Sequence, residues 1–478
     1  MHLVPQASQP TTPTQGAFVD DIALAGKYAR PGPRYTSYPT APQFDDAGAV
    51  TRCQDWLQAQ GHAPISPLSL YVHLPFCRDI CYYCACNKVV TRDVHAAAGY
   101  LQRLEREIEQ RANLHGARRP VTQLHWGGGT PTFLEAADLT RLMHQLASHF
   151  HLLDRPEREY SIEIDPRTVD TGKLALLKGL GFNRVSLGIQ DFDPLVQKTI
   201  NRVQPFTEVA AIVDSVRRLE YTSLGFDLIY GLPHQDRQSM ADTLARVIEL
   251  RPDRIACFNY AHLPRRFPSQ RAIDRLQLPS PAEKIQLQQQ VSRGLCEAGY
   301  VHIGMDHFVL PGDDLAVAQT RGRLQRNFQG YAVHLADELV GLGVSAISQV
   351  GDFYLQNERE LEQYYRRIDA GEMPLARGCQ LSSEDRLRRF IIMSLSCDLR
   401  LDTGECERRF EVDFAGHFAR ELQQLAALAH DGLVAIEPGS IRVTGRGRAF
   451  LRNICMLFDA YLPQRDREAT VQSYSTTI

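Results

Sequence analysis

Short apolar runs alternate with longer amphipathic stretches through the middle of the chain. The runs have the length and the β-branched or aromatic content of buried strands. They are Leu68–His73, Gln123–Trp126, Tyr160–Asp165, Arg184–Gln190, Leu224–Tyr230 and Arg254–Tyr260. The stretches between them have helical spacing, as at Tyr100–Ala112 and Ala136–Phe150. This alternation predicts an α/β protein with a parallel sheet, open or barrel-shaped, whose functional site lies at the carboxyl ends of the strands.

The pattern changes on both sides of these units. Helices are predicted at Ala282–Gly299, Ser383–Cys397, Phe414–His430 and Arg446–Tyr461, with a hairpin through Glu437–Ser440. Helices followed by a hairpin are typical of a winged helix, but the chain lacks the clustered basic face that DNA binding requires. A cover over a large site is the better interpretation. Residues 1–20, rich in Pro, Gln and Thr, are predicted to be disordered.

Three domains follow from these changes: a leader or latch at residues 1–60, a barrel with an extension at 61–375, and a mostly helical, winged-helix-like domain at 376–478. The 53 Lys or Arg and 56 Asp or Glu of the 478 residues give a formal net charge of −3. This near-neutral balance argues against nucleic acid or an anionic membrane surface as the main partner. The sequence starts without a targeting segment and has no stretch of ~20 apolar residues, so a cytoplasmic location is predicted.

Eleven cysteines are the unusual feature of the composition. An odd number in a long chain does not fit a disulfide-stapled secreted module. Seven are scattered and are predicted to be buried free thiols: Cys53, Cys257, Cys296, Cys379, Cys397, Cys406 and Cys455. The other four crowd together as Cys77-x-x-x-Cys81-x-x-Cys84-x-Cys86, which predicts metal binding or redox chemistry.

The spacing of these four cysteines limits the choice of metal. Zinc would need two Cys-x-x-Cys knuckles or matched histidines, and a bacterial ferredoxin run has two residues in each gap. Three thiolates of one short loop can instead hold three irons of a [4Fe–4S] cube and leave the fourth iron open. The run Cys77-x3-Cys81-x2-Cys84 resembles the loop of radical S-adenosylmethionine (SAM) enzymes, in which the open iron binds SAM. A structural zinc or a redox loop is the alternative.

Other candidate residues follow the predicted strands. Gly127-Gly-Gly-Thr130 lacks the Gly-Lys-Ser/Thr of a phosphate-binding loop and resembles the radical-SAM turn that receives the amino group of SAM. Polar side chains end three further strands: Glu163, Gln190 with Asp191, and Asp227. A carboxylate that points into a barrel mouth needs a partner, and a ribose hydroxyl or an ammonium group would serve.

Longer motifs extend through most of the chain. They are Gly32-Pro-Arg-Tyr-Thr-Ser-Tyr-Pro-Thr40, Tyr71-Val-His-Leu-Pro-Phe-Cys77, Cys84-Ala-Cys86-Asn-Lys-Val-Val-Thr-Arg92, His125-Trp-Gly-Gly-Gly-Thr-Pro-Thr132, Gly188-Ile-Gln-Asp-Phe192, Asp227-Leu-Ile-Tyr-Gly-Leu-Pro233, Asn259-Tyr-Ala-His-Leu-Pro264, Gly304-Met-Asp-His-Phe308, Arg326-Asn-Phe-Gln-Gly-Tyr331 and Gly343-Val-Ser-Ala-Ile-Ser348. From about residue 32 to about residue 467 the chain resembles one family of radical SAM enzymes, the oxygen-independent coproporphyrinogen III dehydrogenases of haem biosynthesis. Ala85 stands where Gly is expected.

The resemblance implies a partial (β/α)6 radical-SAM barrel with a mostly helical carboxy-terminal domain and an amino-terminal leader. It implies oxidative decarboxylation of two propionate side chains of coproporphyrinogen III to vinyl groups, giving protoporphyrinogen IX, in anaerobic haem biosynthesis. Because the β C–H bond of a propionate has no acidic proton, this reaction needs radical chemistry from a cofactor rather than a general base. The implied partners are this substrate and an external one-electron donor such as a flavodoxin or ferredoxin, without nucleic acid or membrane, and the chain is expected to be a monomer.

The resemblance also assigns roles to individual residues. Cys77, Cys81 and Cys84 match the ligands of the [4Fe–4S] cluster. The family accommodates two SAM molecules, of which the first is lined at positions matched by Tyr71, Gly128, Glu163 and Ile347. Positions around the second are matched by Tyr83, Gly129, Thr130, Gln190, Arg202, Asp227 and Ala261. Cys86 and His73 match residues that are important for activity and are not settled as cluster ligands.

A substrate with four propionates needs cations, and Arg34 in the leader is predicted to contact it, with Arg202 as a second candidate. The segment Tyr35–Tyr38 is predicted to close the barrel mouth. Two other classes are alternatives. A haem chaperone of the same superfamily typically has Phe where Cys86 stands and lacks the Arg34–Pro39 motif, so both features favour the dehydrogenase. A radical-SAM methyltransferase acting on haem should diverge in the carboxy-terminal half.

Overall fold

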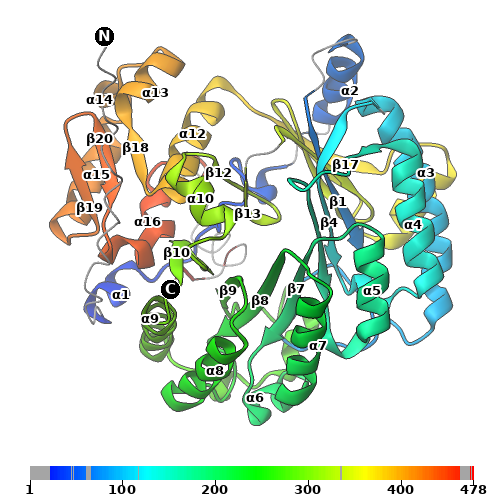
Figure 1. Ribbon diagram of the computed structural model, residues 1–478. Coiled ribbons are helices and arrows are strands. Elements are labelled where there is room, and N and C mark those ends of the chain that lie inside the picture. Colours follow the sequence, from blue (N-terminus) through cyan, green and yellow to red (C-terminus); the bar gives the residue numbers. More distant parts are fainter. Residues whose placement is uncertain are drawn as a thin grey trace, which may run out of the picture.

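The computed structural model describes residues 22–44, 46, 48–60, 66–116, 118–333, 336–462, 474, 476 and 477 (Figure 1). The disorder predicted for residues 1–20 lies outside this range. The centre of one large sheet consists of six parallel strands in the order of their appearance in the chain. They are β1 (Leu68–Leu74), β4 (Pro120–Gly128), β6 (Glu159–Ile164), β7 (Arg184–Gln190), β8 (Ser223–Tyr230) and β9 (Arg254–Asn259). Their parallel pairing confirms the predicted partial (β/α)6 barrel.

Helices between successive strands cover the outer face of this curved sheet (Figure 1). They are α3 (Ala98–His115), α4 (Ala136–His149), α5 (Thr171–Gly179), α6 (Pro194–Thr199), α7 (Phe206–Arg218), α8 (Arg237–Leu250) and α9 (Pro281–Glu297). The apolar stripe predicted for α3 is buried, since Leu101, Leu104 and Ile108 are each at most 2% exposed. Each such side chain contributes about 1.5–3 kcal/mol when removed from water, which holds the helix against the strands.

The sheet continues beyond the barrel on both sides. Next to β1 come β14 (Glu338–Leu342), β15 (Ile347–Val350), β16 (Phe353–Asn357) and β17 (Leu375–Gln380); β14 pairs parallel with β1, and each later pair is antiparallel. Next to β9 come β11 (His307–Val309) and β10 (Val301–Gly304). The predicted boundary at residue 375 falls at the start of β17. The apolar pattern does not predict these strands, because runs this short contain too few residues to establish an alternation.

Smaller elements complete this half of the chain. Three short strands are β2 (Phe76–Cys77), β3 (Val89–Val90) and β5 (His151–Leu152). A separate hairpin consists of β12 (Leu324–Asn327) and β13 (Gly330–Val333), and the helices of this region are α10 (Asp314–Thr320) and α11 (Leu361–Asp369). The pairing of β2 with β3 closes the segment that carries the four clustered cysteines.

The carboxy-terminal elements gather on one side of the barrel (Figure 1). They are α12 (Ser383–Asp398), β18 (Arg400–Asp402), α13 (Thr403–Phe410), α14 (Phe414–His417), α15 (Ala419–His430), β19 (Val434–Glu437), β20 (Ser440–Val443) and α16 (Leu451–Met456). The strands form a small antiparallel sheet in the order β18-β20-β19. Helices with a hairpin are therefore present here, as the sequence predicts.

Two of the predicted helices differ from the structure. The helix expected at Phe414–His430 is divided at Phe418, after a first segment that Gly416 weakens. The helix expected at Arg446–Tyr461 is a 3-10 turn, η7 (Arg446–Phe450), followed by α16. It ends early because the Asp459 side chain accepts the backbone N–H of Tyr461 at 2.9 Å and offers the chain a local turn instead.

The first part of the described leader packs against the carboxy-terminal elements, whereas its last helix packs against the extended edge of the large sheet. It contains α1 (Ile22–Tyr28), an extended segment, the short turn η1 (Ala41–Gln43) and α2 (Gly48–Gln60). The Tyr35 hydroxyl donates to Asp459 at 2.9 Å, and the Tyr38 hydroxyl accepts the N–H of Ala460 at 3.0 Å. Both tyrosines are buried in the same apolar cluster as the carboxy-terminal helices. The segment predicted to close the barrel mouth is thus part of a core.

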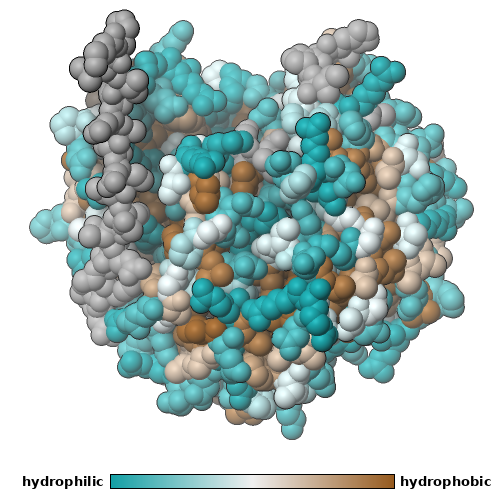
Figure 2. Space-filling model, in the orientation of Figure 1, coloured by the Kyte–Doolittle hydropathy of each residue, from teal (hydrophilic) through white to brown (hydrophobic). Residues whose placement is uncertain are grey.

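Two large apolar clusters result. One lies between the barrel strands and their outer helices, and the other joins the leader to the carboxy-terminal elements. The seven scattered cysteines are buried, as predicted. Hydrophilic residues dominate the face shown in Figure 2, with hydrophobic residues in smaller groups between them. None of the helices in the described part of the chain has both the length and the apolar character that a bilayer crossing demands.

Candidate active site

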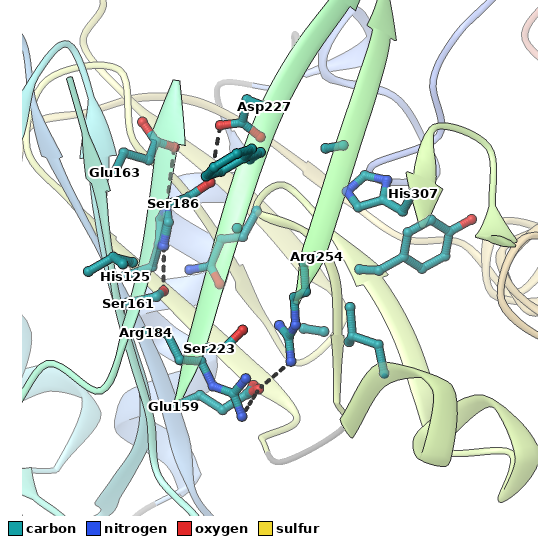
Figure 3. Close-up of a pocket in the computed structure, with 18 of the residues that line it drawn as sticks. His125, Glu159, Ser161, Glu163, Arg184, Ser186, Ser223, Asp227, Arg254 and His307 are labelled. Carbon is teal, nitrogen blue, oxygen red and sulfur yellow. Dashed lines mark hydrogen bonds and ion pairs between the residues drawn. The ribbon is translucent and has the colours of Figure 1, made fainter. Parts of the chain in front are cut away.

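The inner face of the barrel is polar, and its side chains form layers from the amino to the carboxyl ends of the strands (Figure 3). Side chains alternate along a strand, so Glu159, Ser161 and Glu163 of β6 all point inward. In the lowest layer Glu159 lies 3.3 Å from the guanidinium of Arg184 and 3.6 Å from that of Arg254. These ion pairs lie at the bottom of a cavity of about 180 Å³ inside the barrel, and Glu163 lies nearer the mouth.

The mouth holds two carboxyl groups whose pKa values are shifted in opposite directions. Glu163 lies 3.2 Å from His125 Nε2 and accepts the N–H of Gly128 at 3.2 Å. Burial would raise the pKa of Glu163, but the hydrogen bond and charge of His125 and the Gly128 N–H outweigh it and lower that pKa. Burial and the nearby charge of Glu163 raise the pKa of Asp227 to about 7, although Ser186 donates a hydrogen bond to it. An ionised acceptor and a carboxyl that exchanges protons near neutral pH therefore face the same opening.

The cysteine loop, Cys77–Cys86, follows β1 and faces this opening. Its thiols line a cavity of about 380 Å³, which we call the thiol cavity. Three of its sulfurs each lie within hydrogen-bond distance of a donor. The pairs are Thr130 Oγ1 with Cys77 Sγ at 3.5 Å, Arg202 Nη1 with Cys81 Sγ at 3.5 Å, and the Cys86 N–H with Cys84 Sγ at 3.4 Å. Such donors stabilise negative charge on sulfur, which is the form that binds metal.

The arrangement of thiols bears on the kind of metal group they could hold. The Cys86 thiol and the charge of Lys88 lower the pKa of Cys84 to about 6 against the effect of burial. Within the described ranges, no three His, Cys, Asp or Glu side chains converge on one position that could hold a single metal ion. The positions of the thiols therefore do not fit the coordination of a single zinc ion. A [4Fe–4S] cube differs because each of its cysteines binds a different iron, so the sulfurs need not converge.

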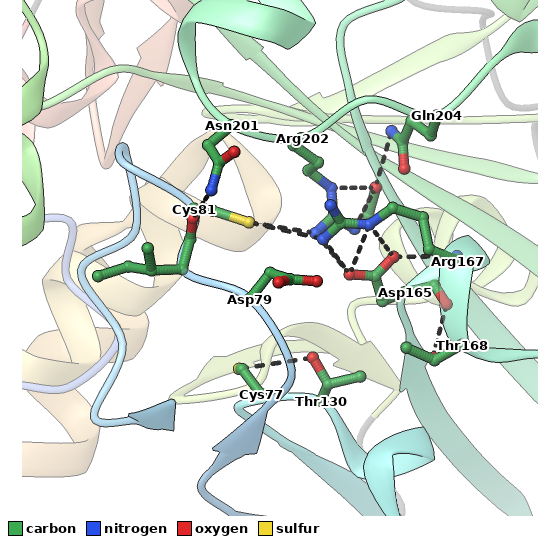
Figure 4. A network of polar contacts seen from close by, with 12 residues as sticks. Cys77, Asp79, Cys81, Thr130, Asp165, Arg167, Thr168, Asn201, Arg202 and Gln204 are labelled. Atoms are coloured by element: carbon green, nitrogen blue, oxygen red, sulfur yellow. Dashed lines mark hydrogen bonds and ion pairs between the residues drawn. The ribbon is translucent and has the colours of Figure 1, made fainter. Parts of the chain in front are cut away.

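A network of two arginines and one aspartate supports Cys81 (Figure 4). Asp165 accepts from Arg202 at 2.9 Å and from Arg167 at 2.7 Å, and Arg167 also lies 3.9 Å from Cys81 Sγ. Burial would raise the pKa of Asp165, but the charge of Arg202 and the hydrogen bonds from Arg167 hold it below its ordinary value. The ionised aspartate thus fixes two guanidinium groups beside one sulfur. Neither residue is predicted from the sequence, although Asp165 directly follows β6 and Arg167 comes two positions later.

The glycine turn after β4 packs against the base of the cysteine loop. Gly128 has a φ of 109°, and a Cβ there would lie 2.5 Å from the His73 imidazole. A Cβ on Gly129 would lie 2.5 Å from the carbonyl carbon of Pro75. Both positions therefore require glycine. At the end of β7, Gln190 has a left-handed φ of 67°, an uncommon conformation for a side-chain-bearing residue and one that often marks a functional site.

Most of the predicted site residues meet in the thiol cavity. Those that line it are Cys77, Cys81, Tyr83, Cys84, Cys86, Gly128, Gly129, Thr130, Glu163, Gln190, Arg202 and Asp227. Tyr71 and His73 lie directly behind, with the Tyr71 hydroxyl 3.0 Å from His73 Nδ1 and the Tyr71 ring stacked on His125. His73 Nε2 in turn donates to the carbonyl of Asn87 at 3.0 Å, just beyond the cysteine loop.

Besides Tyr71 and His73, three predicted residues lie outside the lining of the thiol cavity. Ala261 lines a second, larger cavity, and its carbonyl accepts from a Gln270 amide that also donates to the carbonyl of Tyr83. Arg34 donates to the Asn259 carbonyl at 2.9 Å and lies over the ring of Phe258, which does line the thiol cavity. Ile347 lies on β15 against an apolar cluster that includes Phe44.

Family models match two parts of the chain, the Radical SAM superfamily at residues 71–247 and the HemN C-terminal domain at residues 381–450. The barrel and the cysteine loop thus define a radical SAM enzyme, a class that uses a [4Fe–4S] cluster and SAM. Relatives named oxygen-independent coproporphyrinogen III oxidase are 50% identical in Pseudomonas aeruginosa, over 94% of this chain and 97% of the relative, and 49% identical in Escherichia coli, over 96% and 98%. The chain belongs to the family of oxygen-independent coproporphyrinogen III oxidases, which confirms the resemblance inferred from its motifs.

A solved structure shows the same fold over nearly the whole chain. The coproporphyrinogen III oxidase (HemN) from Escherichia coli has a TM-score of 0.86 and 48% identity, covering 92% of this chain and 99% of that one. This agreement includes the carboxy-terminal half, where a methyltransferase was expected to diverge.

Proposed function

We propose that this protein catalyses the oxidative decarboxylation of two propionate side chains of coproporphyrinogen III to vinyl groups, giving protoporphyrinogen IX, in anaerobic haem biosynthesis. The observation that carries the proposal is that three loop thiols and the polar residues of the strands line one cavity. The chain has 50% and 49% sequence identity to two relatives named as these oxidases. A propionate β C–H bond cannot be broken by a side-chain base, so the thiols are the groups on which the chemistry depends.

Cys77, Cys81 and Cys84 are the proposed ligands of the [4Fe–4S] cluster. The donor set fits this group, because each sulfur has a neighbouring N–H or O–H and the glycine turn packs directly against the base of the loop. When bound, the cluster and SAM supply the one-electron chemistry that the protein itself lacks. The chain places positive charge beside Cys81, keeps Glu163 ionised toward the mouth and surrounds the loop with aromatic rings that limit access of water.

Two SAM molecules are proposed to bind at the mouth. The first would be lined by Tyr71, Gly128, Glu163 and Ile347, and its ammonium or ribose group suits the ionised Glu163. The second would be surrounded by Tyr83, Gly129, Thr130, Gln190, Arg202, Asp227 and Ala261. The thiol cavity has about 380 Å³, within the ~300–1,000 Å³ of a pocket for one small ligand, so the second site extends toward Ala261. Equilibrium dialysis with labelled SAM should give two molecules per chain, and one would contradict this arrangement.

Further roles are proposed for residues at the edges of the site. Cys86, on the cavity wall, and His73, behind it, are needed for activity, and Arg34 contacts the substrate. An external one-electron donor such as a flavodoxin or ferredoxin delivers the electrons, and the protein works as a monomer. The contacts of His73 with Tyr71 and with the Asn87 carbonyl support a role in holding the first SAM position in place.

The deciding experiment is an anaerobic assay of the reconstituted full-length protein with SAM, a reductant and coproporphyrinogen III. We expect two CO2 and one protoporphyrinogen IX per substrate. Stable haem binding without decarboxylation would instead support a chaperone.

A pair of variants separates the cluster from general effects of losing a thiol. Cys81→Ser should lose the iron and the visible absorption of the cluster and reduce turnover by more than about 100-fold. Cys257→Ser, at a buried thiol in the middle of β9, should keep the iron, the visible absorption and the turnover of the parent. Equal iron content in the two variants would contradict the ligand assignment.

A further inference from the structure

A second cavity opens beside the thiol cavity, and the charged side chains among its described lining residues are all cationic. It has about 1660 Å³, well above the ~300–1,000 Å³ of an ordinary small-ligand pocket. Six cationic side chains line it: Arg265, Arg266, Arg275, Lys284, Arg359 and Arg377. No Asp or Glu stands among its described lining residues, although the chain as a whole has more acidic than basic residues. We call it the cationic cavity.

Three of the cations of this cavity have no carboxylate beside them among the described residues. Within the described part of the chain, the guanidinium groups of Arg265, Arg275 and Arg359 have no carboxylate partner. Arg266 feels burial and the like charge of Arg359, and both lower its pKa. Like charges that lie close together repel one another, and this repulsion raises the free energy of the empty cavity. A bound anion would offset the repulsion.

Lys284 shows that one of these cations is held in place. Its stem crosses Gly231 of the β8 turn so closely that a Cβ there would lie 2.8 Å from Lys284 Cε. Its ammonium donates to the carbonyl of Tyr260 at 3.0 Å, and burial lowers its pKa to about 8. The remaining lining is mixed: it includes apolar side chains such as Leu263 and Leu278 and uncharged polar ones such as Asn87 and Gln356.

The cationic cavity is joined to the cysteine loop by direct contacts. Gln270 bridges the carbonyls of Tyr83 and Ala261 at 3.0 Å each, so the wall of one cavity is bonded to the loop of the other. Asn87, which follows Cys86, lines the cationic cavity itself. A ligand seated among the cations therefore lies next to the proposed radical chemistry.

We propose that the cationic cavity binds the carboxylate side chains of the tetrapyrrole substrate, with Arg265, Arg275, Lys284 and Arg359 as the groups that receive them. This inference rests on the proposed function for the identity of the substrate. A large ring with several propionates matches a large cavity whose lining combines apolar side chains with cations, of which Arg265, Arg275 and Arg359 have no carboxylate partner among the described residues. The propionate being decarboxylated would reach toward the thiol cavity while the others stay anchored, so the cavity determines which substrates are accepted.

The test uses the reconstituted holoenzyme and coproporphyrin III, the stable oxidised form of the substrate ring that keeps all four carboxylates. Ultrafiltration with porphyrin absorbance gives the Kd without any turnover. Each of Arg265→Gln, Arg275→Gln and Arg359→Gln should raise Kd about 3- to 10-fold, and the triple variant at least about 30-fold. The triple Lys variant, which keeps the charges, should bind nearly as tightly as the parent, and the tetramethyl ester should be insensitive to every variant.

Arg293→Gln is the matched control, because Arg293 is exposed on α9, the same helix as Lys284, and does not line the cavity. It should leave Kd within about twofold. A triple Gln variant that binds coproporphyrin III as tightly as the parent overturns the inference, and so does an ester that competes equally well. Charge-dependent binding by a protein that never decarboxylates the substrate would overturn the proposed function and leave this site standing.

Discussion

Glu163 and Asp227 show how neighbouring positions on one barrel mouth acquire different chemistry. Both lie in the second half of a strand and both point inward (Figure 3). Glu163 has His125 and a backbone N–H as partners, whereas Asp227 has one hydroxyl and faces the charge of Glu163. Their pKa values move apart, so one carboxyl can receive a cationic or hydroxyl group while the other donates or accepts a proton near neutral pH.

The raised pKa of Asp227 predicts a specific dependence of stability on pH. The fold favours the protonated form, so this contribution is complete below the ordinary carboxyl pKa of about 4 and is lost as pH rises through about 7. Asp227→Asn cannot ionise and does not suffer this loss. Its advantage in thermal midpoint over the parent should therefore grow between pH 5 and pH 8.5, by about 2 °C.

Thermal unfolding followed by circular dichroism, without SAM, measures this difference. Glu163→Gln is the counterpart, because the lowered pKa of Glu163 stabilises the fold above pH 4 and this gain is absent in the variant. Parallel pH profiles for the parent and Asp227→Asn would contradict the assignment.

At the residue scale, the sequence predicts those site residues whose inward orientation follows from the alternation along a single strand. Glu163 and Asp227 follow from inward-facing positions that alternate along β6 and β8. Arg167 was missed because its role depends on Asp165 and on a sulfur 86 positions away. Arg34 was found from its motif, but its contact with the Asn259 carbonyl, 225 positions away, has no local signal.

At the scale of elements, the glycine turn after β4 couples the sheet to the cysteine loop. The Gly129 N–H donates to the carbonyl of Leu74 and the Thr130 N–H to that of Phe76, both at 2.8 Å. The turn thus continues the pairing of β4 with β1 past the end of the strands. Any displacement of this turn is transmitted to Cys77, which follows Phe76 directly.

Gly129→Ala should therefore disturb the site more than the fold. The added Cβ would meet backbone atoms of Pro75 and Phe76, which cannot rotate away, so the strain should cost about 1–3 kcal/mol. We expect a lower thermal midpoint and a loss of bound iron, measured by unfolding and by iron content. Gly179→Ala at the end of α5, where no atom lies within 4 Å of the added Cβ, should be neutral or slightly stabilising. Full iron content in Gly129→Ala would contradict this view of the turn.

The elements also show the limits of the apolar pattern. The six barrel strands were recognised because each is long, apolar and separated from the next by a clear helix. The strands from β10 to β17 were not, because most have three to five residues and are joined by turns rather than helices. The helix expected through Arg446–Tyr461 ends early because Asp459 accepts the N–H of Tyr461 in a local turn and also the hydroxyl of Tyr35 from the distant leader.

At the scale of the whole molecule, the two ends of the described chain are fastened together. The buried Arg452 guanidinium donates to the carbonyls of Pro33 and Thr476 at 3.0 Å each. Pro31 and Thr476 also form a β-bridge. The Arg452 side chain therefore connects the leader with the last described residues. Because Arg452 belongs to α16, it also connects the carboxy-terminal elements with these two segments.

Arg452→Met tests this fastening. It leaves several buried carbonyls without a donor, which should cost at least about 3 kcal/mol in the carboxy-terminal part. We expect a new, lower unfolding transition in calorimetry while the barrel keeps its iron. Arg442→Met, at an exposed arginine paired with Glu437, is the control and should not change the profile. A single unchanged transition in Arg452→Met would contradict the role of Arg452.

Deleting residues 1–40 removes the leader segment altogether. All three proposed cluster ligands and all barrel strands come after residue 66, so the truncated protein should still bind iron. It loses Arg34 at the barrel mouth and the two tyrosines buried under the carboxy-terminal helices, so turnover should be abolished. The assay is turnover per bound cluster, and full activity after truncation would refute this expectation.

The fastening of Tyr35 and Tyr38 to Asp459 and Ala460 also sets the order in which the protein is built. The last strand of the large sheet ends at Gln380, about 80 residues before those partners. At a synthesis rate of about 5–20 residues per second, the barrel exists for about 4–16 s before the leader can dock. During that interval Tyr35 and Tyr38 have no partners, and the leader that carries Arg34 is not fastened at the barrel mouth. Iron–sulfur delivery during synthesis would therefore meet a formed barrel, and docking of the leader would complete maturation.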